Sequence, residues 1–135
     1  MPGWCNGSAG MVHLGCLASR TLGDPSLLEF AIGAGWNALE AAPGVLDLCC
    51  GLAGRGYALL ALHRATGEPR WLERARELAE TGAAAAEALE SEEHPRYALY
   101  KGALGLILLA SDLDRPDMAA MPVFGDEGWR SAKQA

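Results

Sequence analysis

Two short stretches of this chain place cysteines beside glycines, and their thiols carry its most informative chemistry. The stretches are Trp4-Cys5-Asn6-Gly7 and Leu48-Cys49-Cys50-Gly51. An apolar run that predicts a helix follows each, so Cys5, Cys49 and Cys50 are expected near helix N-termini, where the dipole and unpaired N–H groups favour thiolates. Three thiolates can hold a soft metal ion such as zinc and leave its fourth tetrahedral position open. A thiol entering that position would lose its proton, so the pattern predicts attack by a thiol on an electrophilic carbon.

Simple packing is the alternative explanation for these thiols. Buried free cysteine is common in proteins, and the sequence contains no Cys-x-x-Cys pair of the kind that marks many zinc sites. Cys16 lies within an apolar run and is interpreted as a small core residue. His13 lies about two helical turns beyond Cys5, too far to share its metal. It is interpreted as a core residue or one that lines a pore.

A glycine pattern recurs three times along the chain. Each copy has a glycine, two further residues and a second glycine, and an apolar run follows it. The three pairs are Gly7 and Gly10, Gly51 and Gly54, and Gly102 and Gly105. Periods of this size, roughly 45–50 residues, are typical of arrays built from helical hairpins. Glycine suits such turns because it permits positive φ and the close approach of a ligand to the backbone.

The segments between the glycine pairs predict five helices. Their expected bounds are Met11–Leu22, Ser26–Ala42, Tyr57–Ala65, Arg70–Glu90 and Leu106–Leu113. Asp24 is a candidate N-cap for the second, and Gly82 is expected to bend or end the fourth. Helices that follow glycine pairs are apolar all round and those between are amphipathic, which indicates alternating buried and peripheral helices. The predicted fold class is all-α, a partial α/α toroid of inner and outer helices.

Composition limits the possible functions. The chain has 135 residues, enough for one domain, and 50% of them are apolar but only 7% aromatic. Its net charge of −6 argues against a nucleic-acid surface, which needs a basic stripe. No apolar run is long enough to span a membrane, and no signal peptide is visible. A cytoplasmic location is expected, where cysteines serve more often as ligands or core residues than in disulfides.

The ordered motifs resemble those of a known family. Three stretches carry the resemblance: Trp4-Cys5-Asn6-Gly7-Ser8-Ala9-Gly10, Leu48-Cys49-Cys50-Gly51-Leu52-Ala53-Gly54 and Tyr100-Lys101-Gly102-Ala103-Leu104-Gly105. They are similar to the last three glycine motifs of lanthionine synthetase C-like proteins, and Met121-Pro122-Val123-Phe124 is similar to that family's C-terminal ending.

The resemblance implies an α/α toroid with a zinc ion at its mouth, bound by Cys5, Cys49 and Cys50. Cys50 stands where the family usually has histidine, as in its three-cysteine members. The implied reaction is Michael-type addition of a peptide cysteine to dehydroalanine or dehydrobutyrine, which forms a lanthionine thioether. Some eukaryotic-like members instead add glutathione to dehydrated proteins.

The resemblance also implies that residues 1–135 are the C-terminal segment of a cyclase. The family's acid/base histidine and its aspartate partner belong to earlier glycine turns and have no counterpart here, so no catalytic residue is predicted. Expected partners are a dehydrated precursor peptide and an upstream toroid segment or a second copy. One alternative is a degenerate, non-catalytic toroid remnant that binds a peptide or partner subunit. Another is a generic helical-repeat scaffold, which would bind no metal.

Overall fold

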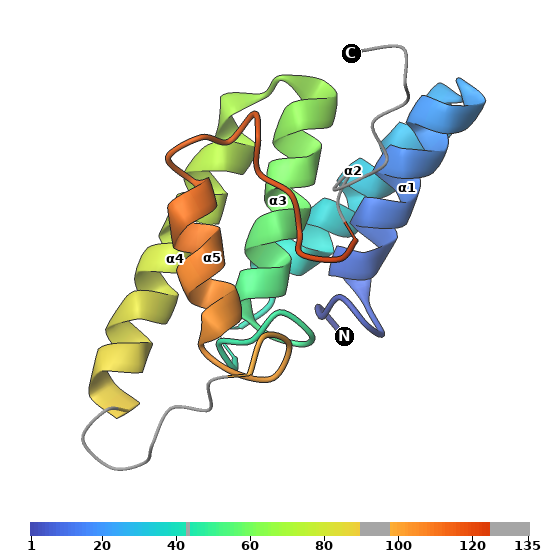
Figure 1. Cartoon of the computed structure of the whole chain (residues 1–135). Coiled ribbons are helices and arrows are strands. Elements are labelled where there is room, and N and C mark those ends of the chain that lie inside the picture. Colours follow the sequence, from blue (N-terminus) through green and yellow to red (C-terminus); the bar gives the residue numbers. More distant parts are fainter. Residues whose placement is uncertain (43, 90–97, 125–135) are drawn as a thin grey trace.

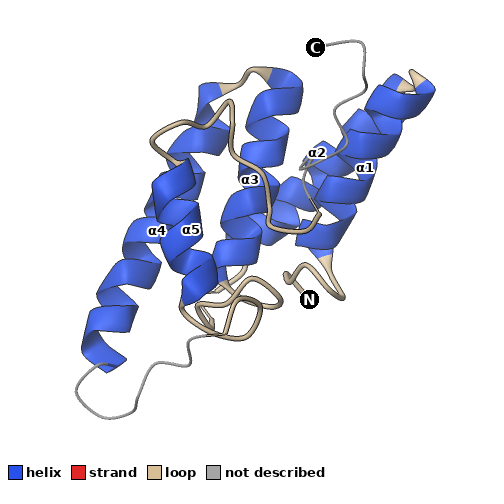
Figure 2. Ribbon diagram, viewed as in Figure 1, coloured by secondary structure: helices blue, strands red, loops and turns tan. Residues whose placement is uncertain are grey.

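The computed structural model describes residues 1–42, 44–89 and 98–124, and these residues contain five α-helices and no strand (Figures 1 and 2). The helices are α1 (Ser8–Leu22), α2 (Pro25–Glu40), α3 (Leu52–Thr66), α4 (Pro69–Leu89) and α5 (Leu104–Asp112). This confirms the all-α prediction. None of these helices is both long and apolar enough to cross a membrane.

The other four helices pack around α3. Figure 1 shows α3 in the middle of the molecule, with α1 and α2 on one side and α4 and α5 on the other. Every residue of α3 from Leu52 to Leu62 is buried. By contrast α4 keeps a charged face exposed and buries Trp71, Ala75 and Ala79 in the core. The starts of α1, α3 and α5 lie at one end of the molecule, as expected for an arc of an α/α toroid.

The first two glycine turns have the same backbone structure. In the first, Ser8 and Ala9 donate their N–H groups to the carbonyls of Met1 and Pro2. In the second, Leu52 and Ala53 donate in the same way to Val45 and Leu46. Each turn therefore pairs N–H groups at the start of its own helix, which would otherwise be unsatisfied. The expectation that unpaired N–H groups face the thiols is wrong for these four groups.

Glycine is needed in these turns for space and not for positive φ. A Cβ at Gly10 would lie 2.1 Å from the Trp4 carbonyl oxygen, and a Cβ at Gly54 would lie 2.0 Å from the Leu48 oxygen. Among the described glycines only Gly23 and Gly67 have positive φ, and both end helices. The expectation that the glycine pairs need positive φ is therefore wrong. The group that approaches these glycines closely is a carbonyl of the protein's own backbone.

The observed helix bounds correct the predicted ones. The helices α1, α3 and α5 begin two to five residues earlier than predicted, at Ser8, Leu52 and Leu104. The reason is that the second glycine of each pair lies inside the first helical turn and does not precede it. The Asp24 prediction is confirmed, because its carboxylate accepts a hydrogen bond of 2.9 Å from the N–H of Ser26.

Gly82 does not end α4, which continues to Leu89. Its small size serves packing, because a Cβ there would lie 2.7 Å from Cδ1 of Leu106 on α5. Gly82 thus lets α4 and α5 approach each other closely.

A buried arginine joins α3 to the end of α2. The Arg55 guanidinium, 2% exposed, donates through Nε to Ala38 O at 2.7 Å and through its other nitrogens to the carbonyls of Leu39, Ala41 and Ala42. Those carbonyls belong to the C-terminal end of α2, where unpaired C=O groups and the helix dipole favour a cation. Burial lowers the pKa of Arg55 below its usual range, but an arginine remains charged in proteins. The cation therefore closes the end of α2 and holds the two residues that follow it, Ala41 and Ala42.

His13 on α1 is partly buried, and its ring Nε2 is enclosed with no hydrogen-bond partner among the described residues. Burial, with a smaller contribution from the nearby Arg64, lowers the pKa of His13 to about 4. The ring is neutral at physiological pH as a result. This agrees with its interpretation as a core residue.

Replacement of Gly54 by Ala should destabilise the fold by at least about 2 kcal/mol, because the new Cβ would overlap a backbone oxygen that cannot rotate away. The matched control is Gly33→Ala on α2, where a Cβ meets nothing within 4 Å. That change should stabilise the protein by up to about 1 kcal/mol through helix propensity. Urea unfolding of both variants measures the difference, and equal stabilities would contradict the steric role of Gly54.

The metal-free chain should lose stability as the pH falls below about 6.5. The pKa of His13 is about 4 when folded, below its usual 6.5, so the unfolded state takes up the proton first. The contribution of His13 to the free energy of unfolding is complete above pH 6.5, and about 2 kcal/mol of it should be lost at pH 5. Urea unfolding at several pH values in this range gives the free energy of unfolding. That free energy should change less steeply with pH in His13→Gln than in the parent chain. Identical slopes would show that His13 does not titrate as described.

Candidate metal centre

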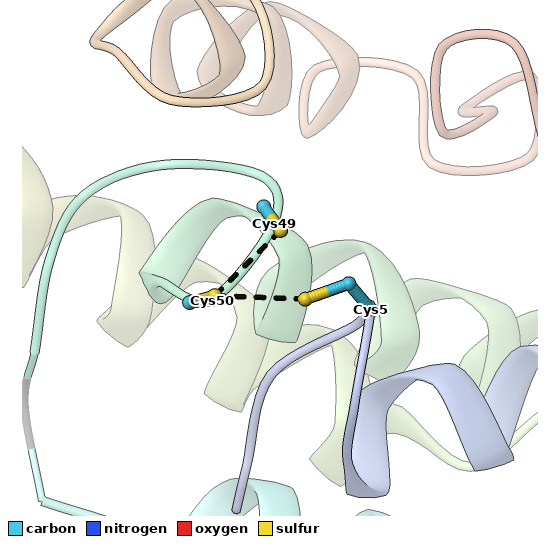
Figure 3. Close-up of side chains that lie close together, drawn as sticks. All are labelled: Cys5, Cys49 and Cys50. Carbon is cyan, nitrogen blue, oxygen red and sulfur yellow. Dashed lines mark hydrogen bonds between the residues drawn. The ribbon is translucent and has the colours of Figure 1, made fainter.

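Three thiols from two glycine turns meet at one end of the helices. The Sγ atoms of Cys5, Cys49 and Cys50 all lie within 4.8 Å of one another. Cys50 Sγ is 3.6 Å from each of the other two (Figure 3). Figure 3 shows Cys5 in the loop before α1, and Cys49 and Cys50 in the loop before α3, with their sulfurs facing one another. The structure thus brings together residues that lie about 45 positions apart in the chain.

Backbone hydrogen bonds fix the first turn against the second. The carbonyl of Cys49 accepts from the N–H of Trp4 at 2.8 Å and from the N–H of Cys5 at 3.2 Å. Within the second turn, the Asp47 carboxylate accepts from the N–H of Cys50 at 2.7 Å. The relative positions of the three sulfurs therefore depend on hydrogen bonds of the protein's own backbone and of the Asp47 carboxylate.

The third glycine turn joins the same assembly. The N–H of Cys49 donates to the carbonyl of Tyr100 at 3.1 Å. The next residue, Lys101, reaches back to the thiols, and its Nζ donates to Cys50 Sγ at 3.3 Å. All three glycine turns therefore contribute either a thiol or a contact to a thiol.

Hydrogen bonding distributes the protons unevenly over the cluster. Hydrogen bonds to Cys49 and then Cys50 raise the pKa of the Cys5 thiol to about 11. The interaction with Cys5, followed by those with Cys50 and Lys101, lowers the pKa of Cys49. The same contacts, with Cys49 first and Cys50 second, raise the pKa of the Lys101 ammonium group. In the metal-free cluster, Cys49 is therefore the better thiolate and Cys5 the better S–H donor.

An aromatic cluster closes one side of the site. The Trp4 ring lies 4.3 Å from the Phe124 ring and 6.1 Å from the Tyr100 ring, centroid to centroid. The Tyr100 hydroxyl donates to the carbonyl of Pro122 at 2.6 Å. These contacts hold the segment that ends at Phe124 against the first glycine turn. On another side, a surface hollow of about 380 Å³ is lined by Trp4, Cys5, Asn6, Gly7, Gly10, Met11 and Leu14.

The thiol geometry suits a tetrahedral metal ion. With metal–sulfur bonds of about 2.3 Å, neighbouring sulfurs of a tetrahedral zinc site lie about 3.8 Å apart. The two measured separations of 3.6 Å are close to that value. Cys5 is exposed, and Cys49 and Cys50 are partly buried. Three cysteines would leave a fourth position for an incoming ligand.

The other residues weighed from the sequence lie outside this cluster. Cys16 packs against the hydrophobic core, where burial raises the pKa of its thiol to about 11, and His13 is enclosed on α1. Sequence reasoning did not select Asp47 or Lys101. Lys101 could have been found from the repeat, since it precedes Gly102 as Cys50 precedes Gly51. Metal binding by the three thiols stays a prediction.

Comparison with known proteins agrees with this architecture. Residues 1–124 match the family model described as lanthionine synthetase C-like protein. A curated relative, glutathione S-transferase LANCL1 of Danio rerio, is 31% identical over 125 residues. The match covers 90% of this chain and 30% of the relative, so the chain spans less than a third of that protein's length. The thiol cluster, the glycine turns and the match to the family model lead to one conclusion: this chain belongs to the lanthionine synthetase C-like family.

Proposed function

We propose that this chain is a zinc-binding segment of a lanthipeptide cyclase. The single observation that carries the proposal is the meeting of the Cys5, Cys49 and Cys50 sulfurs within 4.8 Å of one another. Thiolate sulfurs are soft ligands that select zinc over magnesium or calcium. Family membership supports the assignment and supplies the reaction class.

The proposed reaction is addition of a thiol to a dehydroamino acid. The S–H bond of the thiol breaks, a bond forms between sulfur and the β-carbon of dehydroalanine or dehydrobutyrine, and a proton is added at the α-carbon. The product is a thioether, with no oxidant or reductant needed. Bound zinc would lower the pKa of the thiol and so supply the nucleophilic thiolate.

This chain's own residues would hold the metal and shape its surroundings. Hydrogen bonds from the N–H groups of Trp4 and Cys5 to the Cys49 carbonyl join the two turns that carry the proposed ligands. The hollow beside Cys5 provides room for the peptide that flanks the reacting thiol. Trp4 lines that hollow.

We propose a peptide cysteine of a dehydrated precursor peptide as the substrate thiol. The relative's name favours a second candidate, since that protein is called a glutathione S-transferase. In this alternative, glutathione enters the same position and adds to a dehydrated peptide. The two reactions share their chemistry and differ in whether the thiol and the alkene belong to one molecule.

The proposed activity requires a further toroid segment, which we take to be an upstream one. The cluster holds no histidine that could transfer protons, and the family's acid/base histidine belongs to earlier turns. Exposed apolar side chains also remain on α1 and α5, namely Met11, Leu14, Leu17, Ile107 and Leu108. An upstream segment, continuous with this chain or separate, would bury the α1 side chains and supply the histidine. A degenerate remnant would lack turnover even when that segment is present.

The purified chain should bind one zinc ion, and Cys49→Ala should lower the bound zinc to near zero. Removal of one of three thiolates leaves too few ligands for a stable site. Cys16→Ala is the matched control, because it removes a thiol outside the cluster. Zinc per chain is measured by mass spectrometry of metals after dialysis. A zinc content near zero in the parent chain, or one unchanged by Cys49→Ala, would contradict the proposed ligands.

A dehydrated peptide that contains one cysteine should be cyclised when this chain is combined with the upstream half of a family member, and this chain alone should be inactive. Cyclisation leaves the peptide mass unchanged and abolishes labelling of its cysteine by N-ethylmaleimide. Glutathione addition instead increases the mass by one glutathione. Turnover by the isolated chain would show that the upstream histidine is unnecessary. Zinc binding without turnover in the combined sample would favour the non-catalytic remnant.

A further inference from the structure

Lys101 is a cation placed directly against the thiol cluster. Its Nζ lies 3.3 Å from Cys50 Sγ and donates a hydrogen bond to it. The side chain is exposed, so its folding contribution is small. Since the metal ligands come from the first two glycine turns, this contact gives the third turn a part in the site.

The backbone fixes Lys101 beside the cluster. The preceding residue, Tyr100, accepts a hydrogen bond from the Cys49 N–H through its carbonyl. The Tyr100 hydroxyl donates a hydrogen bond to the carbonyl of Pro122, and the Tyr100 ring lies near those of Trp4 and Phe124. Tyr100 is held through its carbonyl, its hydroxyl and its ring. The backbone position of Lys101, the next residue, is therefore defined.

The charge of the cluster calls for a nearby cation. Three thiolates on a zinc ion leave one net negative charge, and a substrate thiolate in the fourth position adds another. Like charges brought together at short distance repel, and a cation beside the sulfur reduces that repulsion. Hydrogen bonds to metal-bound sulfur also limit how much charge it donates to the metal.

We propose that Lys101 is a positioning residue of the thiol site, whose ammonium group orients the Cys50 sulfur and offsets the negative charge that a bound substrate thiolate adds. This inference rests on the metal site of the proposed function and deepens it. It implies that the site is built to bind a thiol as an anion. Loss of the lysine should therefore weaken the binding of an added thiol more than the binding of the metal itself.

The test uses the purified chain loaded with cobalt(II), whose visible spectrum reports coordination by sulfur. Addition of β-mercaptoethanol should change the spectrum as the thiol enters the open position. Lys101→Met should weaken this thiol binding by about 10-fold or more, which is typical of a lost outer-shell partner. Lys101→Arg keeps a cationic donor and should restore most of the affinity.

Arg115→Met is the matched control, because it removes one positive charge from an exposed residue beyond the far end of α5. It lies roughly 13 Å or more from Lys101, so thiol binding should be unchanged. Equal thiol affinity in Lys101→Met and the parent chain would overturn the inference while leaving the metal site intact. Loss of fold in Lys101→Met, seen by circular dichroism, would also overturn it in favour of a structural role. If the parent chain binds no cobalt, both the proposed function and this inference fail.

Discussion

The buried guanidinium of Arg55 is the interaction that joins the end of α2 to α3, the helix that follows Cys49 and Cys50. It closes the carbonyl end of α2 through four backbone oxygens while it lies on α3. Burial of an arginine is tolerated only when its donors are paired, and here the partners are backbone groups that also need a donor. The cation thereby fixes where α2 ends and where the loop to Cys49 starts. A lysine at this position would keep the charge but not the planar fork that reaches several carbonyls.

The first two glycine turns are repeated units. Gly7 and Gly51 each lie against the carbonyl of the residue six positions earlier, at 2.1 Å for a hypothetical Cβ in both cases. In each unit, the turn accepts hydrogen bonds from the N–H groups at the start of its own helix. Side chains therefore project from the same positions in both units. A thiol can therefore be placed opposite another thiol simply by repeating the turn. The third unit is looser. A Cβ at Gly105 would lie 3.0 Å from the Leu99 oxygen, against 2.1 Å and 2.0 Å at the equivalent Gly10 and Gly54, and its helix starts one residue later relative to the glycine pair.

Much of this architecture could be predicted from residue types, because helix periodicity and the glycine repeat are local signals. The α2 start followed from Asp24 and the residues beside it, since capping depends on neighbours in the chain. The role of Gly82 could not be predicted, because the clash that it avoids involves Leu106 on another helix. The contacts of Arg55 were missed for the same reason, because its partners lie at the end of another helix, α2. The three thiols were found because the repeat itself brought them into register.

The Cys49 carbonyl, which accepts two N–H groups from the first turn, has a consequence for how the site would be used. In many small zinc proteins the ion organises the chain, so metal loss means unfolding. Here the backbone of the two cysteine turns is joined by the protein's own hydrogen bonds. A ligand that reaches the thiols therefore meets side chains whose backbone is already fixed, and little conformational entropy is lost on binding.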